Sequence, residues 1–446
     1  MGDAAVWSVS GVLIVAIVFP YLLAFRHRRQ RDRSRKQEAA RLGIDQPIAQ
    51  FPFVDPKACI GCGTCIEACP EGDVLGIVGG TATVVNGLKC VGHGKCEEAC
   101  PVGAIQVGLG DLRSREDIPL LDAWQETSVP GLFVAGELGG LALVKNAMGQ
   151  GRQVIEQIAQ KVSAGRGPAG GEVQDVTIVG AGPAGIAAAA AAHERQLRYV
   201  TLEQEKDLGG TIFHYPRRKL VLVQAVDVPL WGRMKEAEYQ KEDLLEILLD
   251  LTRRARLRIR FGEKVTDIRR EDGLLSVRTA KGLYRSRFVV LALGRRGTPR
   301  KLGVAGEERP KVMYQLMDAE SYRGQRILVV GGGDSAVEAA LGLARQEGNR
   351  VTLSYRREKL VRIKKKNEDR IQALFKEGRI GALFGSEIQE IREDRVLLKS
   401  GERNVDLPND YVFVFAGGEP PFAFLRQIGV RFGGQDHAAA HRAAEA

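Results

Sequence analysis

The sequence predicts an α/β protein with two parallel sheets, a small α+β module rich in cysteine and one N-terminal transmembrane helix. Three observations lead to this fold class. A strand, a glycine-rich turn and a helix follow one another twice, beginning at Asp175 and at Arg326. All seven cysteines lie between Cys59 and Cys100, and residues 4–25 contain no charged side chain. The chain of 446 residues is long enough for about three domains.

The uncharged stretch at residues 4–25 has the length of a membrane span. At about 1.5 Å per residue it extends over about 33 Å, which is enough to cross the hydrocarbon core. The positive charges follow the stretch instead of preceding it, and no small-residue cleavage site appears, so an uncleaved anchor is favoured over a signal peptide. The positive-inside rule then predicts a single-pass protein of the inner (cytoplasmic) membrane, with its body in the cytoplasm.

The net charge of +10 is concentrated directly after this stretch. Residues 26–41 carry seven arginines and one lysine against Asp32 and Glu38. The much larger remainder is weakly charged, so the composition gives no indication of nucleic-acid binding. Residues 26–50 are predicted to form a basic juxtamembrane helix or linker that anionic lipid headgroups attract.

Residues 51–111 contain two cysteine runs with the same spacing. The first reads C-x2-C-x2-C-x3-C-P, and the second repeats it with His93 in the second position. This pattern resembles the two-cluster bacterial ferredoxins. Zinc, or buried structural thiols, is the alternative. Thiolate ligands and unpaired thiols suit a reducing compartment.

The ferredoxin resemblance implies two iron–sulfur clusters with crossed ligands. The first, a [4Fe–4S] cluster, would take Cys59, Cys62, Cys65 and Cys100. The second would take Cys69, Cys90 and Cys96. His93 is either the fourth ligand of a second [4Fe–4S] cluster or a loop residue beside a three-iron cluster.

Residues 173–295 contain the first strand–turn–helix pattern in a full dinucleotide-binding context. The strand at 175–179 runs into the G-x-G-x-x-G turn, an alanine-rich helix follows, and the next strand ends at Glu203. The glycines allow a tight turn close to a pyrophosphate, the helix N-terminus attracts its charge, and the glutamate can bond the adenosine ribose. The predicted cofactor-binding residues are Gly180, Gly182, Pro183, Ala184, Gly185 and Glu203.

Residues 296–410 contain a second fingerprint, G-x-G-x-x-A. Its predicted nucleotide-binding residues are Gly331, Gly333, Asp334, Ser335 and Ala336. The strand that follows ends without an acidic residue and runs into Arg356 and Arg357. Arginine accommodates the 2′-phosphate of NADP, so the pair favours NADP. With both arginines in solvent, NAD is the alternative.

Residues 116–160 resemble the last segment of thioredoxin-reductase-like flavoproteins, which include the bacillithiol-disulfide reductases. The resemblance rests on Thr-Ser-Val-Pro-Gly at 127–131, Ala-Gly-Glu at 135–137 and a helix at 147–160. It implies FAD as a cofactor, with Gly136 and Glu137 beside the ribityl chain, the glutamate replacing the family's aspartate. Gly210 and Thr211 resemble the stretch beside the flavin ring, with a plain loop as the alternative.

The order of these segments predicts a circularly permuted FAD domain. Its last part, 112–162, precedes its first part, 173–295, with a glycine- and proline-rich linker at 165–171 between them. The NAD(P) domain at 296–410 comes next, followed by a return segment at 411–434 and a disordered tail at 435–446. Permutation is tolerated where the original termini lie close together at the surface. It would tether the clusters near the flavin at high effective concentration.

The expected function is a membrane-anchored NAD(P)H-dependent oxidoreductase that passes electrons, in either direction, between NADPH, FAD and two iron–sulfur clusters. Its other partner would be a ferredoxin-like protein, a quinone or a membrane redox protein, and the resembled family is commonly homodimeric. One alternative is a reductase of a small disulfide acting directly from FAD, because no C-x-x-C pair follows Cys100 for a dithiol relay. Another is a redox sensor without turnover.

Overall fold

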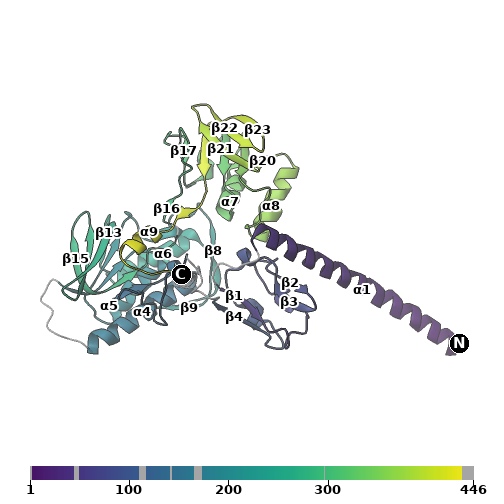
Figure 1. Cartoon of the computed structure of the whole chain (residues 1–446), viewed down its shortest axis with the longest axis horizontal. Coiled ribbons are helices and arrows are strands. Elements are labelled where there is room, and N and C mark those ends of the chain that lie inside the picture. The colour runs from purple at the N-terminus through teal and green to yellow at the C-terminus, as the bar shows by residue number, and fades with distance from the viewer. Residues whose placement is uncertain are drawn as a thin grey trace, which may run out of the picture. The chain divides into compact units, whose positions relative to one another are not determined.

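The computed structural model describes residues 3–44, 50–109, 117–140, 143–164, 173–295 and 297–433. The chain divides into two compact units (Figure 1). The first unit holds residues 1–110 and 361–366, and the second holds residues 111–360 and 367–446. The linker predicted at 165–171 and the tail predicted at 435–446 lie outside the described residues.

The first unit begins with one long helix, α1 (Asp3–Leu42), of 40 residues. Within the part of the chain that the structure describes, no helix combines the length and the apolar composition that a membrane crossing needs. The transmembrane helix predicted over 4–25 is therefore not supported. Its residues form the first part of α1, which continues without a break into the arginine-rich stretch. Several side chains between residues 4 and 21 lie outside the description.

Of the two forms expected for the basic stretch that starts at residue 26, helix or linker, the structure has the helix up to Leu42, and a few of its side chains pack on the module. Asp32 is only 2% exposed, and its Oδ2 accepts the backbone N–H of Ile77 at 3.0 Å. Arg35 donates to the carbonyl oxygen of Asp73 at 2.9 Å. A carboxylate that accepts a backbone hydrogen bond at a buried contact fixes the helix against the strand that carries it.

The rest of the first unit is a small α+β module. Its strands form two antiparallel pairs, β1 (Gln50–Val54) with β4 (Ile105–Leu109) and β2 (Leu75–Val78) with β3 (Thr81–Val84). The short helices are α2 (Thr64–Glu67), η1 (Gly87–Lys89) and α3 (Lys95–Glu98). Gly63 and Gly94 precede α2 and α3 in the left-handed conformation, and Cys65 and Cys96 follow them into the core of the module.

The second unit contains a seven-stranded sheet with the order β12-β7-β6-β15-β14-β13 and with β5 beside β15. Its strands are β5 (Leu132–Val134), β6 (Gln174–Val179), β7 (Tyr199–Glu203), β12 (Ile259–Phe261), β13 (Val265–Glu271), β14 (Leu274–Thr279) and β15 (Leu283–Leu291). The pairs β5–β15, β15–β6, β6–β7 and β7–β12 are parallel. The segment that precedes the first glycine turn in the sequence therefore belongs to the same sheet as that turn.

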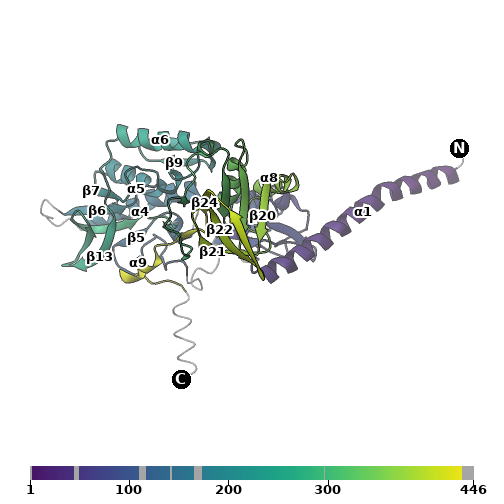
Figure 2. The same ribbon diagram turned by 90° about the horizontal axis from the view of Figure 1, so that it is seen from above.

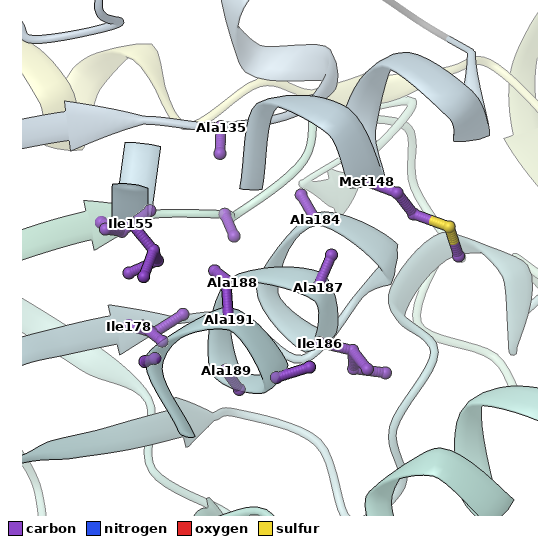
Figure 3. Close-up of a cluster of buried hydrophobic side chains, with 14 of the residues drawn as sticks. Ala135, Met148, Ile155, Ile178, Ala184, Ile186, Ala187, Ala188, Ala189 and Ala191 are labelled. Atoms are coloured by element: carbon purple, nitrogen blue, oxygen red, sulfur yellow. The ribbon is translucent and has the colours of Figure 1, made fainter. Parts of the chain in front are cut away.

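Two apolar cores cover the two faces of this sheet, because successive residues of a strand point to opposite faces. In β5, Phe133 joins one core, while Leu132 and Val134 join the other. The first core packs under α4 (Val144–Ala164), α5 (Pro183–Glu194) and α6 (Lys241–Arg254), and Figure 3 shows the alanine-rich face of α5 within it. The second core includes α9 (Phe422–Gln427), which lies on the opposite side of the sheet in Figure 2.

The second unit also contains a separate five-stranded parallel sheet with the order β17-β24-β18-β19-β20. It consists of β17 (Val312–Met313), β18 (Arg326–Val330), β19 (Arg350–Tyr355), β20 (Ile380–Phe384) and β24 (Tyr411–Val414), with the helices α7 (Asp334–Leu343) and α8 (Lys365–Lys376). The boundary predicted after residue 410 is therefore too early. Residues 411–414 lie between β17 and β18 in this sheet, because their backbone pairs with both strands.

The remaining elements are short pairs and turns around these sheets. Three antiparallel strand pairs are present: β8 (Leu220–Val223) with β11 (Ala237–Gln240), β9 (Val226–Val228) with β10 (Gly232–Met234), and β16 (Thr298–Pro299) with β25 (Gly418–Glu419). A three-stranded antiparallel sheet consists of β21 (Ser386–Ile391), β22 (Arg395–Ser400) and β23 (Arg403–Pro408). The short 3-10 helices are η3 (Glu137–Gly139), η4 (Gly210–Ile212) and η5 (Ala319–Ser321).

Candidate cofactor and cluster sites

Three parallel strands, β5, β6 and β15, end at one edge of the seven-stranded sheet. Ala135 donates its N–H to the carbonyl oxygen of Leu291 at 3.0 Å, and Ala292 donates to that of Val179 at 2.8 Å. The loops that follow these three strands therefore leave the sheet next to one another. Ligands of open parallel sheets bind at the carboxyl ends of the strands, so this edge is where a dinucleotide is expected.

The first glycine turn leaves no room for a side chain at Gly180 or Gly185. Gly180 has φ +108°, and a Cβ on it would come within 2.5 Å of the Ala292 carbonyl oxygen. A Cβ on Gly185 would lie 1.8 Å from the carbonyl oxygen of Gly180. Pro183 then opens α5, and Gly182 before it makes no side-chain cap. The N–H groups of the first turn therefore face the edge without a side-chain partner, which fits a bound pyrophosphate.

Glu203, at the end of β7, is held at this turn. Its carboxylate is 5% exposed and accepts the N–H of Ala181 at 2.6 Å and that of Glu205 at 2.9 Å. A carboxylate with two acceptor sites still open at the glycine turn matches the position from which an acidic residue bonds the adenosine ribose. This role of Glu203 stays a prediction.

The loop before η4 lies against the same turn. Gly209 donates its N–H to the carbonyl oxygen of Ala181 at 2.9 Å. A Cβ on Gly210 would come within 3.3 Å of the Cα of Gly182. Thr211 lies close to Gly294, which follows β15, because a Cβ added to Gly294 would lie 4.0 Å from Oγ1 of Thr211. The structure thus brings Gly210 and Thr211 to the predicted flavin-binding edge.

Gly136 and Glu137 arrive at this edge from β5. Gly136 has φ +92°, and a Cβ on it would lie 3.1 Å from the Cβ of Ala184 in α5. Its N–H donates to Oε1 of Gln150 at 2.8 Å. Gln150 is 8% exposed on α4, and the sequence did not predict its contact with Gly136, although a polar residue on the apolar face of a predicted helix was a usable signal. Glu137 follows as the first residue of η3.

The second glycine turn follows β18 in the five-stranded sheet. Gly331 has φ +143°, and a Cβ on it would come within 2.5 Å of the Phe415 carbonyl oxygen. Gly333 makes no side-chain cap, and α7 begins at Asp334. The carboxylate of Asp334 accepts a hydrogen bond from Asn367 Nδ2 at 2.7 Å, so it is anchored within the protein. Ser335 and Ala336 continue the first turn of α7, and the N-terminus of a helix is the kind of site that binds a phosphate.

Arg356 and Arg357 lie at the same edge as this turn. They follow β19, which pairs in parallel with β18 so that Ser354 lies opposite Val330. Arg356 is exposed and Arg357 is half-buried. Tyr355, which was not predicted as a site residue, packs on the turn, since a Cβ on Gly332 would meet its ring at 2.2 Å. Two arginines that directly follow the strand beside this turn are of the residue type that binds the 2′-phosphate of NADP.

Two recesses in the first unit divide the cysteines into two sets. The first recess, of about 280 Å³, is lined by Cys59, Cys62, Cys65 and Cys100. The second, of about 350 Å³, is lined by Cys69, Cys90 and Cys96 together with His93. These are the crossed sets that the ferredoxin resemblance implies. Among the described residues, no three His, Cys, Asp or Glu side chains lie close enough together to hold a single metal ion.

The chemistry of the recesses suits iron–sulfur clusters. Backbone N–H groups point at sulfur, with Ala82 donating to Cys59 Sγ at 3.3 Å and Ala104 donating to Cys100 Sγ at 3.2 Å. Burial, followed by the charges of neighbouring cysteines, raises the pKa of the Cys65 thiol to about 11. Several thiolates crowded into an apolar recess repel one another, and a cationic iron core relieves that repulsion. The second recess also contains Glu71, which sequence reasoning missed.

These features define a dinucleotide-dependent flavoprotein fold joined to an iron–sulfur module, and comparison with known proteins agrees. Residues 177–443 match the family described as pyridine nucleotide-disulphide oxidoreductase, and residues 51–101 match the 4Fe-4S dicluster domain. The chain belongs to the pyridine nucleotide-disulphide oxidoreductase family. It is a FAD-dependent pyridine nucleotide oxidoreductase that carries an iron–sulfur domain.

Its relatives include proteins that are named for two different activities. Bacilliredoxin reductase Bdr of Bacillus subtilis (strain 168) is 30% identical over 260 residues, which are 57% of this chain and 79% of that protein. A ferredoxin–NADP reductase of Ignicoccus hospitalis is 28% identical over 281 residues, 59% of this chain and 84% of that protein. The solved structure of the bacillithiol disulfide reductase Bdr from Staphylococcus aureus is similar with a TM-score of 0.53 at 26% identity, covering 58% of this chain and 81% of that one.

Proposed function

We propose that this protein passes electrons between NADPH, FAD and two iron–sulfur clusters, in the manner of a ferredoxin–NADP reductase. The observation that carries the proposal is the division of the seven cysteines into two separate recesses, in a chain that also contains two glycine turns of the dinucleotide-binding type. When bound, FAD supplies hydride exchange with the nicotinamide and single-electron exchange with the clusters.

The protein's own residues hold and orient these groups in the proposal. Gly180, Gly182 and the start of α5 (Pro183, Ala184 and Gly185) would bind the FAD pyrophosphate, and Glu203 would bind its ribose. Gly136, Glu137, Gly210 and Thr211 would lie along the ribityl chain and the flavin ring. Gly331, Gly333, Asp334, Ser335 and Ala336 would hold the NADPH pyrophosphate, with Arg356 and Arg357 at its 2′-phosphate.

The FAD domain is proposed to be circularly permuted. The family match begins at residue 177, so residues 117–160 lie outside it. Nevertheless β5 pairs with β15, and α4 packs on α5 in the core of the same domain. A segment outside the match that completes the matched domain is what a permutation would produce. The return segment supports this arrangement, because Phe432 bridges to Pro119.

A second candidate function is the reduction of a small disulfide directly from FAD. It is favoured by the bacilliredoxin reductase and the bacillithiol disulfide reductase among the relatives. The electron-transfer proposal is preferred because every cysteine of this chain lies in the cluster module. A redox sensor without turnover is disfavoured, since the chain belongs to an enzyme family.

The test is anaerobic NADPH oxidation by the purified full chain containing FAD and clusters. A one-electron acceptor, such as a low-potential ferredoxin or ferricyanide, is compared with low-molecular-weight disulfides. Electron transfer predicts rapid reduction of the one-electron acceptor and bleaching of the cluster absorbance. Turnover with a disulfide that leaves the clusters oxidised would establish the second candidate instead.

The cellular setting is proposed from the sequence alone. Residues 4–25 without charge, followed by an arginine-rich stretch, support attachment to the inner (cytoplasmic) membrane with the body in the cytoplasm. The other redox partner would be a ferredoxin-like protein, a quinone or a membrane redox protein, and the chain would form a homodimer. Fractionation tests the location, because a peripheral basic helix is released by high salt, whereas an inserted segment needs detergent.

A further inference from the structure

The two recesses of the cluster module lie at opposite ends of the hairpin that β2 and β3 form. Val74 and Leu75, where β2 begins, line the second recess. Ala82, next to the turn of the hairpin, lines the first recess. A Cβ on Gly61, which also lines the first recess, would come within 2.2 Å of the carbonyl oxygen of Gly80 in that turn. The first recess is therefore at the turn, and the second is at the open end of the hairpin.

Helix α1 runs along this hairpin toward the first recess. Arg35 contacts Asp73, just before β2, and Asp32 accepts the N–H of Ile77 in the middle of β2. One turn earlier in α1, Nη2 of Arg29 lies 3.4 Å from where a Cβ on the second glycine of the hairpin turn would be. The part of α1 that precedes Arg29 therefore leaves the module at the end that holds the first recess.

The part of α1 that leaves the module there combines apolar and basic side chains. Leu22, Leu23 and Phe25 are exposed, and exposed arginines follow at positions 26, 28 and 29. An apolar surface next to clustered arginines suits a lipid surface that carries negative charge. The apolar groups enter the boundary of the acyl chains, and the arginines lie among the phosphates.

The rim of the first recess continues this apolar surface. Ile60 is 65% exposed, Val102 is 44% exposed, and both line the recess together with the exposed Cys62. Large apolar side chains gathered at an exposed rim mark an interaction site. The other end of the hairpin is occupied by the chain's own segment 361–366, since Lys364 Nζ lies 3.3 Å from Oε1 of Glu71, which lines the second recess.

We propose that the end of the module with the first recess docks on an anionic lipid surface, through Ile60, Val102 and the arginines of α1. The first cluster, and not the second, then lies next to the membrane. The inference rests on the proposed function, from which it takes the clusters and the membrane attachment. A lipid surface is favoured over an acidic redox protein because the uncharged stretch at 4–25 extends the apolar surface far beyond the module.

The experiment uses the anaerobically purified full chain with FAD and both clusters, mixed with phosphatidylcholine vesicles that contain or lack phosphatidylglycerol. Hydrogen exchange reports which loops the lipid covers. A gadolinium chelate on the lipid headgroups speeds the spin relaxation of the nearer reduced cluster, and Cys62→Ser identifies the signal of the first cluster by removing it. The variants are Ile60→Asp combined with Val102→Asp, and Arg29→Gln. The control is Phe53→Asp, at an exposed apolar residue of β1 in the same module.

Anionic vesicles should slow exchange in α1 and in the loops that carry Ile60 and Val102, and the gadolinium lipid should act more strongly on the first cluster. The double variant should lose protection of these loops while α1 stays protected, and Phe53→Asp should behave like the wild type. Arg29→Gln should lower the affinity for anionic vesicles about fivefold, which is the contribution of one basic residue at such a surface. The relaxation measurement on the wild type carries the test if the double variant does not fold.

Four outcomes would overturn the inference. Protection of α1 without the loops would leave the membrane attachment standing but remove the docking surface. Stronger relaxation of the second cluster would reverse the orientation. Protection by an acidic ferredoxin but not by vesicles would assign this end to a protein partner, and protection that grows with protein concentration alone would assign it to a second copy of the chain.

Failure of the proposed function has a different signature. NADPH oxidation with a one-electron acceptor is measured in solution without vesicles, so it does not depend on docking. A protein that docks through the first recess but reduces no acceptor would overturn the electron-transfer proposal and support the docking surface. A protein that reduces the acceptor but binds no vesicles would overturn the docking surface and the membrane attachment together.

Discussion

Gly151 of α4 lies directly on the backbone of Ala184 in α5. A Cβ at residue 151 would come within 2.2 Å of the carbonyl oxygen of Ala184. Gly151 belongs to the segment that precedes the first glycine turn in the sequence, and Ala184 belongs to the turn itself. The contact shows how closely the two parts of the domain are packed, and it locates a position where the arrangement can be tested.

Gly151→Ala should destabilise the FAD domain. The added methyl group meets backbone, which cannot move aside cheaply, so overpacking should cost about 1–3 kcal/mol of unfolding free energy. Gly149→Ala is the matched control on the same helix, because nothing lies within 4 Å of its added Cβ. Replacing that glycine should stabilise the helix by up to about 1 kcal/mol. Denaturant unfolding followed by flavin fluorescence measures both, and equal effects would contradict the close contact.

Gln150→Leu should weaken FAD binding. The change removes the acceptor for the Gly136 N–H, and a buried donor left without a partner costs about 1–3 kcal/mol. The dissociation constant for FAD should therefore rise about 5- to 150-fold, as measured by flavin fluorescence on dilution. Gln153→Leu, at an exposed position of the same helix, is the control. If both variants retained FAD equally, the hydrogen bond would have no part in the site.

Arg356→Ala combined with Arg357→Ala should raise KM for NADPH and leave KM for NADH almost unchanged. Each charge-assisted hydrogen bond to the 2′-phosphate contributes about 1.5–3 kcal/mol, so KM for NADPH should rise at least about tenfold. Steady-state kinetics with both nucleotides measure the split. Arg370→Ala, an exposed arginine of α8, serves as the control. An equal rise for the two nucleotides would show that the pair does not contact the phosphate.

Cys62→Ser should remove the first cluster and leave FAD in place. A serine hydroxyl is a poor replacement for a thiolate ligand of iron, whereas the FAD site is built from other elements. Visible and paramagnetic-resonance spectra should lose the signal of one cluster, and reduction of a one-electron acceptor by NADPH should fall. Unchanged acceptor reduction in a variant that lacks this cluster would rule out a route through it.

Asp32→Ala should loosen α1 from the cluster module. The change leaves the Ile77 N–H without its acceptor and removes the negative charge beside Arg35, at an expected cost of about 1–3 kcal/mol for the local contact. Hydrogen exchange should accelerate in the second half of α1 and in β2. Gln37→Ala, an exposed position of the same helix, should leave exchange unchanged. Acceleration of both variants to the same extent would show that Asp32 does not anchor the helix.

The parts of the protein that could be predicted are those in which function depends on nearby residues. The turn at Gly180 and the turn at Gly331 each need a strand, closely spaced glycines and a helix, all within about twenty residues. The cysteine runs are similar, because their spacing reflects a short loop that wraps around a cluster. Local sequence was less reliable at boundaries, since residues 411–414 are in the five-stranded sheet and α4 begins at Val144, before the predicted start.

By itself, the sequence indicated the class of cofactor at each site, a dinucleotide or an iron–sulfur cluster. Phosphate-binding turns and cysteine ligand runs each consist of residues that lie only a few positions apart. Only the tertiary structure decided that β5 joins β15, that Asp32 is buried, and that Glu71 meets both His93 and Lys364. The physical reason is that burial and long-range pairing depend on which surfaces the folded chain brings together. The pairing of Glu71 with Lys364 joins residues nearly three hundred positions apart, and no periodicity or spacing in the sequence encodes such a contact.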